Sequence, residues 1–433
     1  MNHSMTNHSQ TPLPERLTAI QLQHPPDLLT SFQSLGKMSH PPPQPTFVGL
    51  PTELKTKVFS YIAGKVDRKA MTLVSYECNK VMAPIQWYTL TLKVGSKPSG
   101  ELDILLCSGN NILRHVHQLN IKNGVYRTPA QRSRFDFDGI FKLIIFALPE
   151  NNLRCFQSDT HISPHLIRCL FLTQNALQEL SFNGLTLAEN PGAPTSRAEV
   201  AAYVAPVLLN VKKLTISIKQ WDCNKYEDSA QLITHTPKLE FLHLHSKYST
   251  VFVINKRPGL DALGGPFALG QEPKKLAEFH LESINCGEVP SSLLEFNDYS
   301  VLRFLSITRC HYLDQFFNGL SKKFAQACAL ISLKIVLPVR GFGWKEDITQ
   351  LVELLLISIT SPLQSIELDM GSNQMVHGSS LAKHSPSLES LTLTATQSMQ
   401  EPPVSLDSIL KIRESAPNLK DLKIGPRYYL KST

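Results

Sequence analysis

A pattern of apolar residues with the form L-x-x-L-x-L recurs along residues 93–433. The last two apolar residues of each copy alternate with other residues, which is typical of a short strand with one buried face. One such unit cannot bury its apolar face alone, so we expect the copies to stack into a single solenoid of parallel strands. The ten copies are Val116-Leu119-Ile121, Leu177-Leu180-Phe182, Val211-Leu214-Ile216, Leu239-Leu242-Leu244, Leu276-Phe279-Leu281, Leu302-Leu305-Ile307, Leu330-Leu333-Ile335, Leu363-Ile366-Leu368, Leu388-Leu391-Leu393 and Leu419-Leu422-Ile424, and Leu153-Phe156 begins a weaker copy that breaks at Ser158.

The stretches between the copies carry helical spacing in several places. Helices are predicted at 197–209, 228–234, 322–329, 348–357 and 405–413. Strands that alternate with helices in this way predict an α/β fold with a parallel sheet, which is the architecture of a β/α horseshoe.

Residues 47–92 have a different character, because they carry three short amphipathic helices. Pro51 can stand at the first position of a helix that ends at Gly64. Asp67 can cap a second helix, and Ser75 can cap a third. A bundle of this size buries too little surface to be stable without a neighbour or a partner.

Residues 1–46 are polar and rich in proline, and they show no sustained hydrophobic period. Such a segment cannot bury enough apolar surface to offset the entropy lost on ordering. We therefore expect a disordered leader that is dispensable for folding. The sequence thus predicts three parts: the leader at 1–46, the helical segment at 47–92 and the repeat array at 93–433.

Four elements stand in order in the helical segment: Leu50-Pro51-Thr52-Glu53-Leu54, Val58-Phe59-Ser60-Tyr61-Ile62, Leu73-Val74-Ser75 and Trp87-Tyr88. This order resembles the F-box motif as it occurs in fungal proteins, and the array that follows resembles leucine-rich repeats. The stretch 64–69 departs from the motif, because it is more polar than the leucine-bearing step that the family usually has there.

The resemblance implies a function. An F-box protein binds a Skp-type adaptor of a cullin ubiquitin ligase, and its repeats hold a target protein for ubiquitination and degradation. Catalysis then comes from proximity to the ligase, and the chain itself is not an enzyme and needs no cofactor. By match to the motif, six residues would form the adaptor-facing surface: Leu50, Pro51, Leu54, Val58, Phe59 and Ile62.

In a repeat of this type, the residues that alternate with the buried ones face the concave side of the solenoid. Large aromatic residues are not required there by the core, so Phe241 and Phe304 indicate an anchor for a target. His243 and His280 flank this anchor, and Glu278 and Glu282 lie on the same face. Glu367 and Asp369 make the far end acidic. The predicted target-binding residues are Phe241, His243, His280, Phe304, Glu367 and Asp369.

The composition of the chain limits the class of protein, the partners and the cellular compartment that we expect. The chain has 433 residues, 42% hydrophobic and 18% charged, which is typical of a globular protein. Its net charge of +7 is spread along the sequence without a basic run, so nucleic acid is not an expected partner. The eight cysteines are widely spaced and form no C-x-x-C pair, which indicates free thiols in a reducing compartment. With no secretory signal and no membrane span, we expect the cytoplasm or the nucleus.

No motif for phosphate binding, nucleophilic catalysis or metal binding is present. His243 and His245 alternate along a predicted strand, but no third or fourth metal ligand accompanies them. Two alternatives to the ligase subunit stay open. One is a repeat scaffold that binds protein or RNA without any ligase, and the other is an enzyme whose active site the sequence does not reveal.

Overall fold

The computed structural model describes residues 49–94 except 63, 111–123, 137–183, 204–217, 232–246, 273–286 except 285, 294, 296–338, 348–370, 376–396 and 412–427. The leader predicted at 1–46 lies outside these residues. Residues Thr56–Thr433 form one compact unit. That unit contains two of the three N-terminal helices and every strand described below.

Three helices begin the described chain: α1 (Thr52–Ser60), α2 (Lys65–Thr72) and α3 (Tyr76–Gln86). Ser75 caps α3 as predicted, because its side-chain oxygen accepts a 3.1 Å hydrogen bond from the backbone N–H of Cys78. Asp67 lies in the first turn of α2 and not before it, so the predicted cap there is wrong. Four buried side chains form a small core separate from the main one: Phe59, Cys78, Val81 and Met82.

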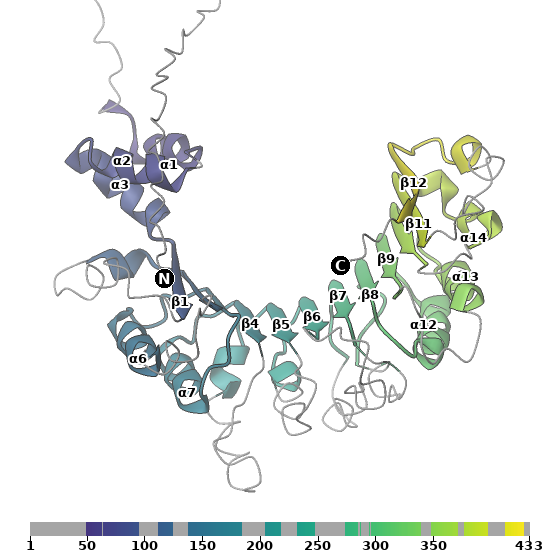
Figure 1. Ribbon diagram of the computed structural model, residues 1–433, viewed down its shortest axis with the longest axis horizontal. Helices are drawn as coiled ribbons and strands as arrows, with labels where there is room; N and C mark the ends of the chain where they lie inside the picture. The colour runs from purple at the N-terminus through teal and green to yellow at the C-terminus, as the bar shows by residue number, and fades with distance from the viewer. Residues whose placement is uncertain are drawn as a thin grey trace, which may run out of the picture. The chain divides into compact units, whose positions relative to one another are not determined.

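Twelve parallel strands follow and form one sheet in which the spatial order is the chain order (Figure 1). The strands are β1 (Thr89–Val94), β2 (Gln118–Asn123), β3 (Cys155–Ser158), β4 (Glu179–Asn183), β5 (Lys213–Ser217), β6 (Phe241–His245), β7 (Glu278–Glu282), β8 (Phe304–Thr308), β9 (Ser332–Val336), β10 (Ser365–Asp369), β11 (Ser390–Thr396) and β12 (Asp421–Arg427). This α/β arrangement of helices and successive parallel strands is the repeat solenoid that the sequence predicts.

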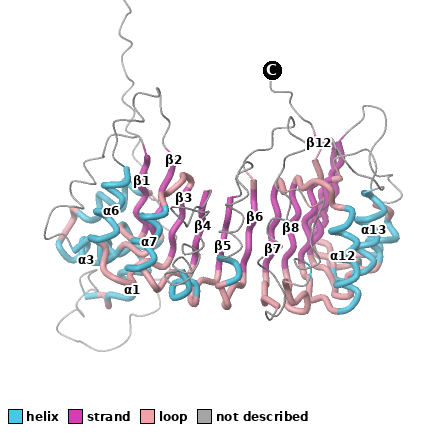
Figure 2. Tube along the Cα trace, turned by 90° about the horizontal axis from the view of Figure 1, so that it is seen from below, coloured by secondary structure: helices cyan, strands magenta, loops and turns pink. Residues whose placement is uncertain are grey.

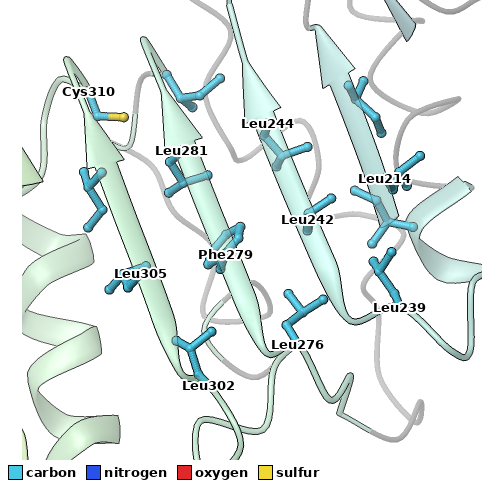
Figure 3. Packing of buried hydrophobic residues seen from close by; sticks show 14 of the residues in the cluster. Leu214, Leu239, Leu242, Leu244, Leu276, Phe279, Leu281, Leu302, Leu305 and Cys310 are labelled. Carbon is cyan, nitrogen blue, oxygen red and sulfur yellow. The ribbon is translucent and has the colours of Figure 1, made fainter. Parts of the chain in front are cut away.

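Inward-facing residues of successive strands lie at the same level (Figure 3). Leu242 is in register with Phe279, and Phe279 is in register with Leu305. Two residues further along, Leu281 pairs with Ile307 of the next strand. All five side chains are buried in one continuous core. The prediction that Leu242, Leu281 and Ile307 lie on neighbouring parallel strands is confirmed.

Each strand from β2 to β12 is entered through the same hydrogen-bonded step. The carbonyl oxygen of the residue just before one strand accepts two N–H groups at the entry of the next strand. Lys212 O, for example, accepts from Glu240 N at 2.9 Å and from Phe241 N at 3.0 Å, and Ala277 O accepts from the two residues that enter β8. The acceptors are Tyr88, His117, Arg154, Gln178, Lys212, Glu240, Ala277, Arg303, Ile331, Gln364 and Glu389. This step fixes the spacing at the N-terminal ends of all the strands.

Two strands depart from the sequence pattern. Strand β1 is not predicted by L-x-x-L-x-L, because Trp87 occupies the first apolar position ahead of Leu90 and Leu92. In β3 the second inward position is Ser158, which is buried in register with Ile121. Its hydroxyl donates a 2.7 Å hydrogen bond to Thr160 O, so the polar group is satisfied.

The described returning helices lie on one face of the sheet, and none of them covers the opposite face (Figure 1). Figure 2 shows the strands side by side. The helices are η2 (Asn111–His115), α6 (Phe137–Ala147), α7 (Pro164–Thr173), α12 (Asp314–Gln326), α13 (Ile348–Ser358), α14 (Gly378–Ala382) and η4 (Ser385–Ser387). Helix α13 confirms the prediction at 348–357, whereas α12 begins before 322 and ends before 329. The helices predicted at 197–209, 228–234 and 405–413 lie only partly within the described residues, and their described parts at 204–208, 232–234 and 412–413 are helical. The face without helices is called the open face below.

Candidate functional site

Residues 54–76, on the three N-terminal helices and in the turns between them, expose many large apolar side chains. Of the fifteen that are exposed in the described chain, seven fall between residues 54 and 76. Leu73 is 81% exposed, which is a large apolar area to leave in water. The seven are Leu54, Val58, Tyr61, Val66, Leu73, Val74 and Tyr76. Clustered exposure of this kind is typical of a protein-binding surface.

Five of the six residues predicted to face an adaptor keep part of their surface in solvent: Leu50, Pro51, Leu54, Val58 and Ile62. Phe59 does not, because it is only 2% exposed and fills the small core beside Met82. The assignment of Phe59 to the binding surface is therefore corrected to a core residue. Ile62 packs, partly buried, against the same core. Adaptor binding by the remaining residues stays a prediction.

On the open face, three rows of residues cross β6, β7 and β8. The rows are Phe241–Glu278–Phe304, His243–His280–Ser306 and His245–Glu282–Thr308. They alternate with the buried leucines, and most of these side chains are only partly buried. The parallel register therefore brings residues far apart in the sequence into one small area.

Four rings of these rows contact one another. The His280 ring lies between two phenyl rings, with its centroid 4.8 Å from that of Phe241 and 4.9 Å from that of Phe304. The His243 ring meets His280 edge-on at 5.7 Å. We call these four residues the ring ladder. The structure thus brings together the four residues predicted at the centre of the concave face, although their binding of a target stays a prediction.

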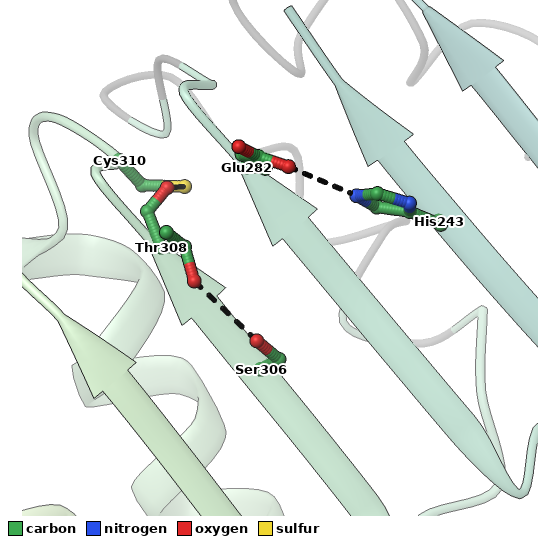
Figure 4. A network of polar contacts seen from close by, with 5 residues as sticks. All are labelled: His243, Glu282, Ser306, Thr308 and Cys310. Carbon is green, nitrogen blue, oxygen red and sulfur yellow. Dashed lines mark hydrogen bonds and ion pairs between the residues drawn. The ribbon is translucent and has the colours of Figure 1, made fainter. Parts of the chain in front are cut away.

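Two carboxylates of β7 border the ring ladder. Glu282 Oε2 lies 3.4 Å from His243 Nε2 (Figure 4). Glu278 Oε2 lies 3.5 Å from His280 Nε2, but the geometry is not that of a hydrogen bond. Both carboxylates are about half-exposed. They are therefore available to solvent and held only loosely by the imidazoles.

Burial lowers the pKa of both histidines. For His243, desolvation is the largest cause, and the Glu282 carboxylate opposes it. For His280, desolvation is again the largest cause, nearby His243 lowers the pKa further, and Glu278 opposes both. Both imidazoles are therefore neutral at physiological pH, and the two carboxylates keep their net charge.

The charged residues on either side of this area are already paired. Lys213 Nζ lies 3.0 Å from Glu179 Oε1, and Lys334 Nζ lies 2.9 Å from Glu367 Oε1. Asp369 is 4% exposed, so the expectation that it presents an acidic surface is wrong. The far end of the open face is therefore a neutralised Lys–Glu pair and not the acidic flank that the sequence suggested.

The described cysteines are free thiols, and two of them meet in the core. Cys286 and Cys310 contact each other, and burial together with that contact raises the pKa of Cys286 well above its usual value. Burial, and then the neighbouring Glu179 carboxylate, raises the pKa of Cys155 to about 12. Neither Cys155 nor Cys286 is a thiolate at neutral pH, so neither has the form of a nucleophile.

Within the described ranges, no three His, Cys, Asp or Glu side chains are placed so that they could hold a metal ion. None of the described helices is both long enough and apolar enough to cross a membrane. No protein-family model matches the chain, and no curated protein sequence matches it significantly. Function is therefore inferred from the geometry above.

The importance of Glu278 is not evident from the sequence. The residue is visible as a concave-face position, but its place in one row with Phe241 and Phe304 depends on the pairing of β6 with β7 and of β7 with β8. The signal was present, because all three residues stand at the same position of consecutive repeat copies. Aligning the copies by position predicts the row directly.

Proposed function

We propose that this chain is the substrate-recognition subunit of a Skp–cullin–F-box ubiquitin ligase. The observation that carries the proposal is the exposure of apolar side chains at F-box positions ahead of a repeat solenoid, namely Leu54 and Val58 on α1 and Leu73 and Val74 in the turn after α2. Apolar surface left in water on so small a helical segment favours a permanent or frequent protein partner.

In this role the chain needs no catalytic residue of its own. The Skp-type adaptor docks on the exposed apolar residues of α1 and its neighbours, and the open face of the sheet holds the target protein. The ligase then acts on a target that is kept close by, and the gain in rate comes from proximity. Such a subunit works in the cytoplasm or the nucleus.

The energetics favour an adaptor interface. Covering the remaining exposed half of Leu54 or Val58 would contribute about 1 kcal/mol for each side chain. Removing a central contact of such an interface costs more than its buried area suggests, because the partner groups are also left unpaired. We therefore expect a few residues near the start of α1 to dominate binding.

The test is co-purification of the full chain with a Skp-type adaptor, followed by measurement of the dissociation constant. Alanine at both Leu50 and Pro51 should weaken binding by about 2–4 kcal/mol, which is about 30- to 700-fold. Leu54→Asp should abolish it, because a carboxylate would be buried without a partner.

A matched control is Leu354→Asp on α13, since Leu354 is 46% exposed and Leu54 is 49% exposed. That control should bind the adaptor like the wild type. Unchanged adaptor binding by both the Leu50/Pro51 double variant and Leu54→Asp would refute the assignment.

The second candidate is a repeat scaffold that binds protein or RNA and has no ligase partner. Two observations favour it: Phe59 is part of the core, and α2 is a polar helix that begins at Lys65. Failure to recover the adaptor with the wild-type chain would select this alternative.

A further inference from the structure

Glu278 is the only charged residue of the row that it shares with Phe241 and Phe304. We propose that this part of the open face binds an arginine side chain of an extended protein segment. Its guanidinium would stack on the ring ladder and pair with the Glu278 carboxylate. The inference deepens the proposed function, because it names the chemistry of the target that the receptor would hold.

The ring ladder provides the stacking surface. His280 lies nearly parallel to Phe304, with an interplanar angle of 27°, and Phe241 continues the surface on the other side. All three rings are partly exposed. A planar cation is attracted to aromatic faces, and a guanidinium is the side-chain cation that both stacks on rings and pairs with a carboxylate in two parallel hydrogen bonds.

Charge complementarity selects a cation over an anion. The neighbouring lysines, Lys213 and Lys334, are each paired with a carboxylate of an adjacent strand. Glu278 and Glu282, by contrast, lie closest to imidazoles among the charged groups of the described residues. Lys213 acts on Glu278 only from a longer distance. At neutral pH this area of the open face is therefore negative.

The spacing of the two carboxylates suggests a second contact. Glu278 and Glu282 occupy the first and last positions of β7. Four residues along a strand span about 13 Å, so an extended segment lying along β7 would meet both carboxylates with basic residues four positions apart. Glu282 is thus the secondary site for the same segment.

Protonation of the histidines should oppose this binding. His243 faces Glu282, His280 and His245, with Lys213 on the strand beyond, and His280 faces Glu278, His243 and, from β9, Lys334. An imidazolium at either position would neutralise a carboxylate and repel the guanidinium. Affinity should therefore be constant above pH 7 and decrease as the pH falls below 6.5.

The experiment uses the full chain and a fluorescein-labelled heptapeptide, and fluorescence polarisation reports binding. The probe is built of glycine and serine, with arginine as its second and sixth residues. Its control carries citrulline at the same two positions, which keeps the shape and removes the charge. The arginine probe should bind at least tenfold more tightly than the citrulline probe.

Two kinds of variant locate the site. Glu278→Gln should weaken binding of the arginine probe at least fivefold, and Glu282→Gln should weaken it less. Glu389 is a half-exposed glutamate that is paired with Lys420 elsewhere in the array, and Glu389→Gln should leave binding of the arginine probe unchanged. Phe304→Leu keeps an apolar side chain but removes the ring face, so it should also weaken binding severalfold.

Equal binding of the arginine and citrulline probes, or no binding of either, would overturn the inference. So would preference for a probe with glutamate at the two positions, which would mean that the imidazoles recognise an anion. Wild-type affinity in Glu278→Gln would place the site elsewhere. These measurements need no adaptor, so they can fail while adaptor binding succeeds, and adaptor binding can fail while they succeed.

Discussion

His384 lies between α14 and η4, and its imidazole is buried. Its Nε2 is 3.0 Å from the backbone carbonyl oxygen of Leu356, so Nε2 carries the hydrogen and donates it. Nδ1 is also buried and has no hydrogen-bond partner in the part of the chain that the structure describes. Burial accordingly lowers the pKa of His384 from its usual value of 6.5, and the charge of nearby Lys383 adds to this effect.

The pH dependence of stability follows from this lowered pKa. As the pH falls below 6.5, the unfolded chain takes up a proton at His384 before the folded chain does. The contribution of the neutral imidazole is therefore complete above that pH and is lost as the pH falls toward the folded pKa. The limiting slope for one proton is about 1.4 kcal/mol per pH unit.

Replacing the imidazole of His384 separates the loss of its hydrogen bond from the loss of its titration. His384→Leu leaves the Leu356 carbonyl without its donor, which should cost about 1–3 kcal/mol at pH 8. The variant has no proton to take up, so its free energy of unfolding should depend less on pH. The gap between variant and wild type should therefore narrow between pH 7 and pH 5.

Urea unfolding followed by circular dichroism at several pH values measures this gap. Ser385→Ala is the control, because Ser385 is the next residue, is also buried and carries no titratable group. That variant should be destabilised by a constant amount at every pH. If the His384→Leu and wild-type curves ran parallel from pH 8 to pH 5, His384 would protonate equally in the folded and unfolded chains, and the reasoning would be wrong.

Two further substitutions test the helices and the sheet. Ser75→Ala removes the cap of α3 and should lower the stability of that helix by about 1 kcal/mol. Amide hydrogen exchange at the first turn of α3 should then be faster, and unchanged exchange would contradict the role of Ser75 as the cap. Phe279→Ala should lower the free energy of unfolding in urea by about 3–5 kcal/mol, because Phe279 is buried on β7 between neighbouring strands. Leu143→Ala, on the exposed side of α6, should change it by about 0.5 kcal/mol or less, and equal losses in the two variants would contradict the solenoid core.

The strands of the array were predictable, because an inward-facing residue in a parallel solenoid needs an apolar side chain at fixed spacing. Ten copies kept leucine or a similar residue at these positions, and all ten are strands. The pattern does not predict strand β1, because Trp87 stands where the other copies have the first leucine or valine. Helical spacing at 322–329 does not reveal the start of α12 at Asp314, because such spacing marks the interior of a helix better than its ends.

Side-chain exposure was less predictable than the strands. Phe59 stands in a motif that suggests a surface, yet its burial depends on α3, which packs against it. Asp369 follows the alternation of its strand but is buried all the same. The pairing of Lys334 with Glu367 arises because β9 and β10 are neighbours, which periodicity within one strand does not reveal.

The shared carbonyl step at the strand entries limits where the sequence tolerates insertions. Because the preceding strand is linked to the next one at its entry, an insertion there would shift the strand and turn its leucines to the wrong face. A second link repeats just beyond the C-terminal ends of β6 to β10, where the first N–H after a strand donates to a carbonyl oxygen of the next strand, as Ser283 N does to Thr308 O at 2.8 Å. Past that link the copies differ in length, as between 245 and 278 and between 369 and 390. New segments can therefore be added beyond this second link without disturbing the core, and a second binding loop or a reporter domain can be grafted there.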